Sequence, residues 1–146
     1  MAIEDAERVT ADRLAKFRRH LDHLQELRPR VTSAETLRRD LTLHNDVLYS
    51  LLAVCQLLID IAGDLAGRRG QRFDNYTEAV RSLTAYPEFP DRLVRDLEPL
   101  PGLRRVLLED CVARDLDRVI PALELLPPLE EFAEGVLRLE SRHGDA

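Results

Sequence analysis

Apolar residues recur at helical spacing near the start of the chain. Within residues 5–27 they follow one another at intervals of three and four, and charged residues occupy the positions between them. This spacing places the apolar side chains on one face, which predicts an amphipathic α-helix over these residues. The apolar face consists of Leu14, Phe17, Leu21 and Leu24.

The segment RPRVTSAE interrupts this first helix. Pro29 disfavours helical backbone at Arg28, because the proline ring crowds the residue before it. Thr32 or Ser33 can cap the start of the next helix, and Glu35 is placed to close a capping box. We therefore expect one helix to end and another to begin within this segment.

The next predicted helix covers about residues 34–65 and is the longest element. Its apolar residues form two neighbouring seams, so both flanks are predicted to be buried, as in the central helix of a bundle. One seam contains Val47, Leu51, Val54, Leu58, Ile61 and Leu65, and the other contains Leu48, Leu52, Cys55, Ile59 and Ala62. The remaining polar stripe consists of Tyr49, Gln56, Asp60 and Asp64.

The second half of the chain predicts shorter helices. A loop, GRRGQRFDN, precedes the first of them, and prolines separate several of the others. These helices are predicted over residues 76–85, 91–97, 102 to about 112–115, 116–125 and 129–142. No segment shows the alternation typical of a strand. We therefore expect an all-α, antiparallel helical bundle with one long central helix, built as a single domain of residues 1–146.

Length, composition and charge narrow the class of protein. A chain of 146 residues, 45% of them hydrophobic, can bury a core without disulfides or metals. Its net charge of −6 argues against a protein that coats nucleic acid non-specifically. Cys55 and Cys111 both fall in predicted helices, at a spacing that suggests neither a disulfide framework nor a metal clip. We expect both to be small core hydrophobes in a reducing, cytoplasmic environment.

The sequence favours a protein without a membrane partner. The first residues, MAIEDAERVT, are acidic and polar, unlike a signal peptide. The most apolar stretch, LLAVCQLLIDIA, is interrupted by Gln56 and Asp60 and is too short to span a bilayer.

Two pairs of polar residues on the long helices are candidate sites. His20 and His23, three positions apart, could supply two ligands to a metal, but no third ligand stands at a suitable spacing. We favour a solvated helix face there and expect no metal. Asp60 and Asp64, four positions apart, either face water or line a cleft, especially one that a dimer would form. Both interpretations of the aspartates stay open.

The segment GLRRVLLEDC, residues 102–111, carries two adjacent arginines and two adjacent acids. Arg105 and Glu109 are spaced as an ordinary ion pair on an exposed helix. Arg104 and Glu109 would differ by about 140° around a helix axis, so one helix cannot easily bring both to the same atom. Two copies of the helix, facing each other across a two-fold axis, could surround a phosphate jointly.

Several segments in order resemble the HepT-like proteins of the HEPN superfamily. CQLLIDIAGDL on the long helix corresponds to a family segment like LQ…DIA, and NYTEAV corresponds to an aromatic Y-x-E segment. GLRRVLLEDC, followed by VARDLDRVI, aligns without a gap with the family signature G-hydrophobic-R-N-x-L-V-H-x-Y. The resemblance covers roughly residues 10–140, and the order and spacing of the segments carry it.

The resemblance implies a role for each signature position. In the family, which comprises metal-independent ribonuclease toxins, the arginine contacts phosphate and the histidine moves protons at the ribose 2′-hydroxyl. The tyrosine is the residue that a nucleotidyltransferase antitoxin modifies with AMP. Here the arginine is retained as Arg104, and the asparagine, histidine and tyrosine positions hold Arg105, Glu109 and Cys111. The resemblance implies no cofactor.

These replacements favour a weakened site. A glutamate can act as a general base, but at ordinary acidity it is a poor proton donor to a leaving group. Cys111 offers no phenolic hydroxyl to modify. The leading hypothesis is a homodimeric HepT-like protein with a weakened or inactive ribonuclease site, a minimal nucleotidyltransferase as partner and RNA as a further candidate ligand. The alternatives are an active ribonuclease toxin that uses Arg104 and Glu109, and a helical substrate-binding subunit of a nucleotidyltransferase.

Overall fold

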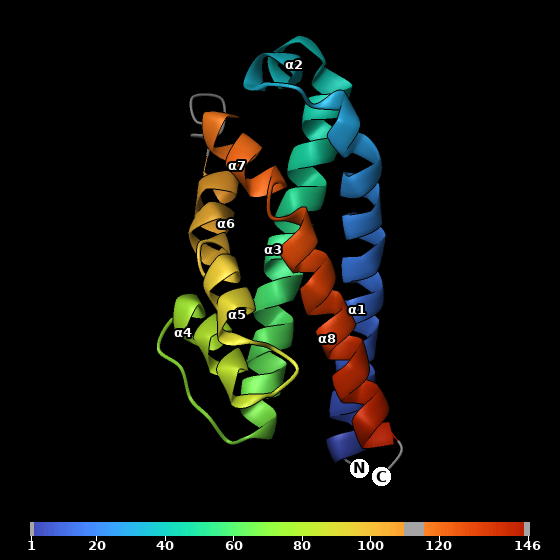
Figure 1. The fold of residues 1–146 in the computed structure, drawn as a ribbon, viewed down its shortest axis with the longest axis vertical. Helices are drawn as coiled ribbons and strands as arrows, with labels where there is room; N and C mark the ends of the chain where they lie inside the picture. Colours follow the sequence, from blue (N-terminus) through green and yellow to red (C-terminus); the bar gives the residue numbers. More distant parts are fainter. Residues whose placement is uncertain (1, 110–115, 145–146) are drawn as a thin grey trace.

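Three long helices run along the molecule and confirm the all-α bundle (Figure 1). The computed structural model describes residues 2–109 and 116–144, and every regular element in these ranges is helical. The long helices are α1 (Ala2–Leu27), α3 (Leu41–Arg68) and α8 (Leu126–Gly144). α1 runs antiparallel to α3 and α8, so α1 begins and α8 ends at the same end of the bundle.

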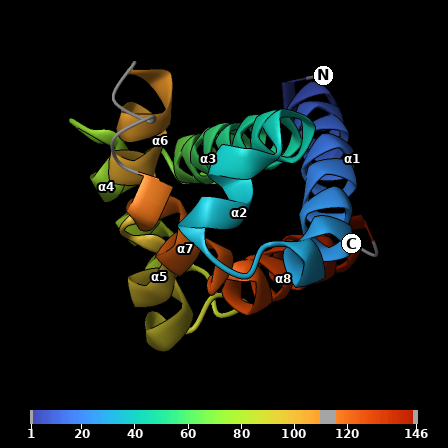
Figure 2. The same cartoon turned by 90° about the horizontal axis from the view of Figure 1, so that it is seen from above.

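Shorter elements connect the long helices and cover the far side of α3. Seen from above, α4 and α6 lie on one side of α3 and α1 lies on the other (Figure 2). α3 is therefore the central helix, as its two apolar seams predict. The short α-helices are α2 (Ala34–Arg39), α4 (Tyr76–Arg81), α5 (Asp91–Leu97), α6 (Leu100–Leu108) and α7 (Val119–Leu123). The 3-10 turns are η1 (Arg28–Arg30), η2 (Ser82–Ala85) and η3 (Leu116–Arg118).

Both seams of α3 reach the hydrophobic core. All six residues of the first seam are buried. In the second seam Cys55, Ile59 and Ala62 are buried, whereas Leu48 and Leu52 are half-buried. The difference arises because α1 packs along much of α3, while the helices on the other side are short.

The helix predicted over residues 34–65 is two helices, so this prediction was wrong. Asp40 separates them with an extended backbone (φ −122°, ψ 99°), and its side chain caps α3 by accepting a hydrogen bond from the Leu43 N–H at 3.0 Å. The predicted capping box is also wrong: Ser33 occupies the N-cap position of α2 but makes no capping hydrogen bond. Glu35 instead pairs with Arg38 and Arg39.

Prolines mark the beginnings of two helices rather than breaks before them. α8 starts at Leu126, so Pro127 and Pro128 lie in its first turn rather than ahead of it. Pro101 likewise lies in the first turn of α6. Proline fits there because the first-turn N–H groups have no partner within the helix. The terminal helix is thus longer than the sequence predicted.

A cluster of aromatic rings joins α1, α8 and the turn before α5. The Phe132 ring stacks on Phe89 at 5.6 Å between centroids and meets Phe17 edge-on at 5.5 Å. All three phenylalanines are buried. The Tyr86 hydroxyl donates a 2.7 Å hydrogen bond to the Leu65 carbonyl, and burial raises the pKa of this phenol. These contacts fix the end of α3 against the later helices.

α3 is long and apolar enough that it could cross a membrane by itself. It has 28 residues, and its most apolar 18-residue window has a mean hydropathy of 1.6. The argument from length in the sequence analysis was therefore wrong. Half of that window is buried inside the bundle, and a central helix needs the same apolar character because neighbouring helices cover it.

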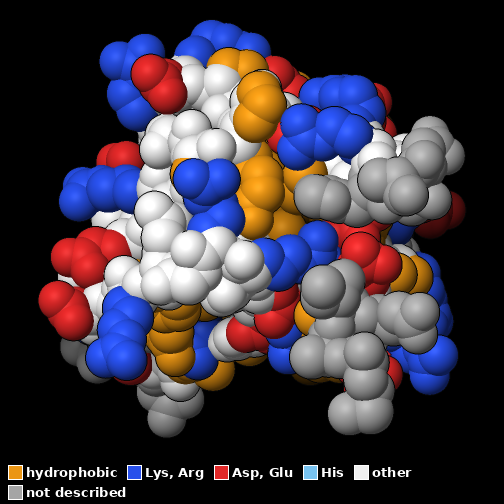
Figure 3. All heavy atoms as spheres, turned by 90° about the horizontal axis from the view of Figure 1, so that it is seen from below, with side chains coloured by type: hydrophobic (Ala, Val, Ile, Leu, Met, Phe, Trp, Pro, Cys, Tyr) orange, Lys and Arg blue, Asp and Glu red, His pale blue; other side chains and the backbone are white. Residues whose placement is uncertain are grey.

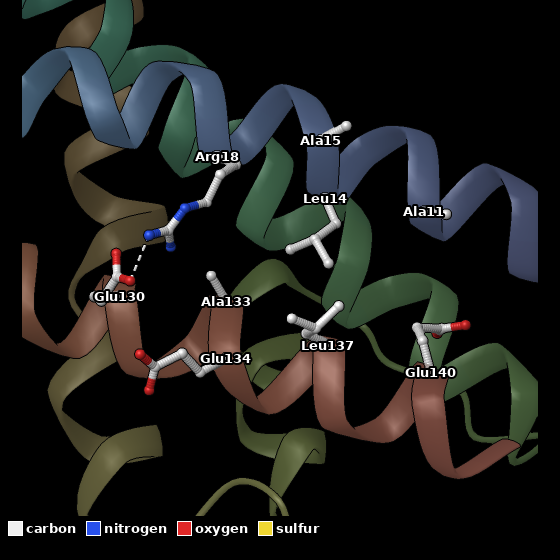
Figure 4. A pocket seen from close by; sticks show the side chains of 9 residues that line it. All are labelled: Ala11, Leu14, Ala15, Arg18, Glu130, Ala133, Glu134, Leu137 and Glu140. Carbon is white, nitrogen blue, oxygen red and sulfur yellow. Dashed lines mark hydrogen bonds and ion pairs between the residues drawn. The ribbon is translucent and has the colours of Figure 1, made fainter. Parts of the chain in front are cut away.

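An apolar groove lies between α1 and α8, as Figure 4 shows. Its volume is about 560 Å³, and its lining includes Leu14, Ala133 and Leu137. Arg18 and Glu130 pair across one end of it. Elsewhere charges of both signs are interspersed, as on the lower end of the bundle, where they surround a small hydrophobic area (Figure 3).

Candidate functional site

The signature segment lines a polar groove between the starts of α4 and α6. The groove has a volume of about 850 Å³. Asp74 and Asn75, which precede α4, and Tyr76, its first residue, border it, as do three arginines and one acid of the later chain. Those four residues are Arg104, Arg105, Glu109 and Arg118. α6 presents this face because its opposite side, with Leu100 and Leu103 buried, packs on α3.

Arg104 is held from two sides. Its Nε–H donates a hydrogen bond to the side-chain oxygen of Gln56 on α3. Its guanidinium lies 5.2 Å from the ring centroid of Tyr76, within the range of a cation–π contact. The Gln56 amide nitrogen in turn donates to Asp60 at 2.9 Å. Arg104 is half-buried, so these contacts restrict a side chain that still reaches the groove.

Tyr76 owes its place to the start of α4. The Asn75 side chain accepts a 2.9 Å hydrogen bond from the Glu78 N–H, and Glu78 accepts one from the Asp74 N–H at 2.8 Å. This reciprocal pattern resembles a capping box and fixes the first helical residue at Tyr76. The sequence analysis did not name Tyr76 or Gln56 as site residues. The N-x-x-E spacing of NYTE is the signal that could have located Tyr76.

Glu109 leaves the helix instead of continuing it. α6 ends at Leu108, and Glu109 has an extended backbone (φ −89°, ψ 150°). The prediction that this helix reaches residues 112–115 was therefore wrong, and so was the helical angle assumed between Arg104 and Glu109. Both side chains border the same groove because the chain turns after the helix. Cys111, in the tyrosine position, lies outside the described residues.

The groove arginines are not neutralised within the described residues. Among residues 5–109 and 116–142, no carboxylate oxygen lies within the 4.0 Å ion-pair distance of Arg104, Arg105 or Arg118. Arg68 is different, since it lies 2.9 Å from Glu140. The groove thus combines three cationic groups with the carboxylates of Asp74 and Glu109. An anionic ligand such as a phosphate suits the cations, whereas the two acids oppose it.

Asp60 and Asp64 do not line this groove and do not act as a pair. Asp64 points to α1, where it forms an ion pair with Arg13 and accepts a long hydrogen bond from Thr10. The hydrogen bond to Asp64 raises the pKa of Arg13. Asp60 instead accepts a hydrogen bond from Gln56, although its charge also contributes to the raised pKa of Arg13. The two carboxylates therefore have different hydrogen-bond partners.

His20 and His23 lie near polar partners of α3. The His20 Nδ1 is 3.3 Å from the Ser50 hydroxyl, and His23 lies 3.9 Å from Asp46. Desolvation, with smaller contributions from Arg19 and His23, lowers the pKa of His20. Within the described part of the chain, no group of three or more His, Cys, Asp or Glu residues could hold a metal ion.

Cys55 is a core residue, as predicted. It is fully buried on α3, and desolvation raises the pKa of its thiol to about 12 even though the Arg104 charge acts in the opposite direction. A thiol of this kind is almost entirely protonated at neutral pH and is a poor nucleophile.

Solved structures share this helical fold, as a comparison of the whole bundle shows. No family model and no curated protein matches the sequence. A toxin–antitoxin structure with AMP-PNP superposes with a TM-score of 0.75 at 20% identity, covering 90% of this chain and 98% of the other. A tri-AMPylated Shewanella oneidensis HEPN toxin in complex with an MNT antitoxin gives 0.74 at 20% identity, covering 89% and 97%. A mutant of the MntA-HpeT toxin–antitoxin gives 0.74 at 20% identity, covering 90% and 98%. The chain therefore has the fold of these HEPN toxins.

Proposed function

We propose that this chain is the HepT-like component of a toxin–antitoxin module, with a weakened or inactive ribonuclease site. One observation carries the proposal: the groove keeps an ordered arginine, Arg104, but presents the carboxylate of Glu109 where the resemblance expects an imidazole. The HEPN-type fold around this groove supports the family role.

In this proposal the site still binds RNA but cleaves it slowly or not at all, because the two activities need different groups. Arg104 can contact a phosphate of RNA through its Nη groups, because its Nε–H alone is used by Gln56. Cleavage also needs a group that gives a proton to the leaving oxygen. Glu109 is exposed and places a carboxylate at the edge of the groove, where the resemblance expects the imidazole that would carry out this proton transfer. Loss of such a group typically reduces the rate by about two to four orders of magnitude.

The proposed partner is a minimal nucleotidyltransferase, and the proposed assembly is a homodimer in the cytoplasm. The Shewanella oneidensis HEPN toxin is tri-AMPylated and bound to an MNT antitoxin. In this chain the tyrosine position holds Cys111, so a partner would have no phenol there to adenylylate. We therefore expect complex formation with such a partner but no AMP on that position. Co-expression with a nucleotidyltransferase encoded beside this chain, followed by affinity purification and intact mass measurement, tests both expectations.

Cleavage of RNA by the purified protein tests the weakened site. Wild type at substoichiometric amounts is expected to leave a single-stranded RNA intact at neutral pH while still binding it, and Arg104→Ala is expected to weaken that binding. Multiple-turnover cleavage that Arg104→Ala abolishes would instead establish the active toxin. If cleavage also stops in Glu109→Gln, the carboxylate is the working acid–base group.

A further inference from the structure

Gln56 and Tyr76 contact Arg104 from two other helices, and Asp60 in turn contacts Gln56. Gln56 and Asp60 come from α3 and Tyr76 from α4, and both segments are among those that resemble the HepT-like family. We propose that Gln56 and Asp60 are a positioning pair that orients Arg104 toward an anionic ligand without neutralising the guanidinium charge. The Tyr76 ring restricts the movement of the Arg104 side chain from the opposite side. The inference rests on the proposed function, since it concerns the phosphate-binding arginine of that site.

Asp60 sets which end of the Gln56 amide faces Arg104. An ionised carboxylate only accepts hydrogen bonds, so the amide NH₂ of Gln56 must turn toward Asp60, at 2.9 Å. The amide oxygen is then directed to the Nε–H of Arg104. With the amide reversed, its NH₂ would face a guanidinium that has no acceptor. The order Asp60–Gln56–Arg104 is therefore the arrangement that satisfies all three groups.

The neutral acceptor preserves the charge of Arg104. A carboxylate at position 56 would pair with the guanidinium directly, as Glu140 does with Arg68 at 2.9 Å. Here the negative charge of Asp60 is one side chain farther away. The contact uses Nε–H only and leaves both Nη groups for a ligand. Arg104 is thus held firmly but not compensated.

Tyr76 restricts the guanidinium from the groove side. Its ring centroid lies 5.2 Å from the guanidinium carbon, and the capping contacts at the start of α4 hold the residue. An arginine that is already ordered loses less rotamer freedom when it binds a ligand. The competing role for these contacts is to satisfy the hydrogen-bonding groups of a half-buried arginine. The two roles differ in whether ligand affinity depends on the charge at position 56.

The test uses the full-length protein and a fluorescein-labelled single-stranded RNA, with affinity read by fluorescence anisotropy across a salt series. Near neutral pH, Gln56→Glu is expected to weaken binding by about fivefold to tenfold and to reduce the salt slope by about 0.7, the share of one phosphate contact.

Three further variants separate charge from shape. Gln56→Met keeps the volume but removes the acceptor, so it is expected to bind more weakly while leaving the salt slope unchanged. Asp60→Asn no longer dictates the amide orientation and is expected to give an intermediate loss. Gln71→Glu adds the same charge at an exposed position in the loop before α4, where the side chain makes no hydrogen bond within the described residues, and is the matched control, which is expected to bind like wild type. Thermal unfolding of each variant shows whether the fold is retained.

Nitrogen-15 NMR of the arginine side chains separates failure of this inference from failure of the proposed function. The Arg104 Nε–H is expected to exchange slowly with solvent in wild type and rapidly in Gln56→Met. If wild type fails to bind RNA but shows this protection, the proposed function is wrong, whereas the contact between Gln56 and Arg104 is established. The positioning is overturned if Nε–H is unprotected in wild type, or if Gln56→Glu binds RNA as tightly as wild type at neutral pH. If a variant does not fold, the exchange rate of the Arg104 Nε–H in the wild type decides whether the positioning contact exists.

Discussion

The ring of Phe89 lies against Gly135 so closely that a Cβ atom on the glycine would lie 2.7 Å from the ring edge. The same atom would lie 3.1 Å from the Glu88 carbonyl oxygen. Real Cβ atoms are not found at the first of these distances, and Phe89 cannot retreat because it stacks on buried Phe132. Gly135 is therefore required by packing between α8 and the turn before α5.

Gly135→Ala is expected to destabilise the protein by about 1–3 kcal/mol, because an overpacked core shifts its backbone or rotamers. Gly102→Ala is the matched control. A Cβ there meets nothing within 4 Å, so the substitution is expected to be neutral or to stabilise α6 by up to about 1 kcal/mol. Urea unfolding of both variants measures the difference. Equal effects of the two substitutions would contradict the close contact.

The ion pair between Arg68 and Glu140 is expected to matter more than the surface pairs. Their side chains are only 18% and 16% exposed, so Arg68→Met would leave a largely desolvated carboxylate without its cation. We expect a loss of about 1–3 kcal/mol. The control is Arg39→Met: Arg39 and Glu35 are 80% and 53% exposed, and the expected loss is below about 0.5 kcal/mol. Chemical denaturation would contradict this prediction if Arg39→Met cost as much as Arg68→Met.

His20 is expected to make the fold less stable in weak acid. Its pKa is lowered in the folded protein, chiefly by desolvation, so the unfolded chain binds a proton more readily. His20 therefore contributes fully to the free energy of unfolding above the ordinary histidine pKa. This contribution is lost as the pH falls from that value through the lower pKa of the folded state. His20→Gln removes this contribution. The free energy of unfolding is measured near pH 7.5 and near pH 5, and the change between the two should be smaller in the variant than in the wild type. The same change in both proteins would refute the assignment to His20.

The Cys55 thiol is expected to resist alkylation in the folded protein. With a pKa of about 12, only about one thiol in ten thousand is ionised at pH 8, and the residue is fully buried. In a Cys111→Ser background, labelling by iodoacetamide should proceed only as fast as the protein opens. Labelling in urea gives the reference rate. Rapid labelling without denaturant would show that the α3 core is open to solvent.

Restoring the signature is expected to raise cleavage. Glu109→His combined with Cys111→Tyr returns an imidazole to the edge of the groove and should increase RNA cleavage by about two to four orders of magnitude. Adding Arg104→Ala should remove the gain. Cleavage kinetics on one RNA compare the three proteins. If the double variant is no faster than wild type, the residues at positions 109 and 111 do not limit the rate of RNA cleavage.

Local pattern was enough to find most helices but not their ends. The spacing of apolar residues predicted α1 and the buried seams of α3, because helical periodicity is a property of neighbouring residues. The pattern missed three helix boundaries, which lie at Asp40, Leu108 and Leu126. Helix ends depend on capping contacts and on where the chain must turn to pack, and several outcomes are compatible with one local sequence.

The candidate site was predicted in part. The resemblance identified Arg104 and Glu109, and the structure brings both to one groove. It gave no reason to expect that Gln56 would hold Arg104, 48 positions away in the chain. Likewise Asp64 and Asp60 looked equivalent on one polar stripe, yet one pairs with Arg13 and the other with Gln56.

The sequence by itself determined the class of structure: amphipathic helices around one apolar central helix, with an arginine and a carboxylate in place of the full HepT-like signature. Only the tertiary structure decided which polar groups meet. Periodicity defines the face on which a side chain lies, but the register of one helix against another depends on how all the side chains between them pack. For this reason the surroundings of Arg104, and with them its capacity to bind an anion, became apparent only when α3, α4 and α6 were assembled.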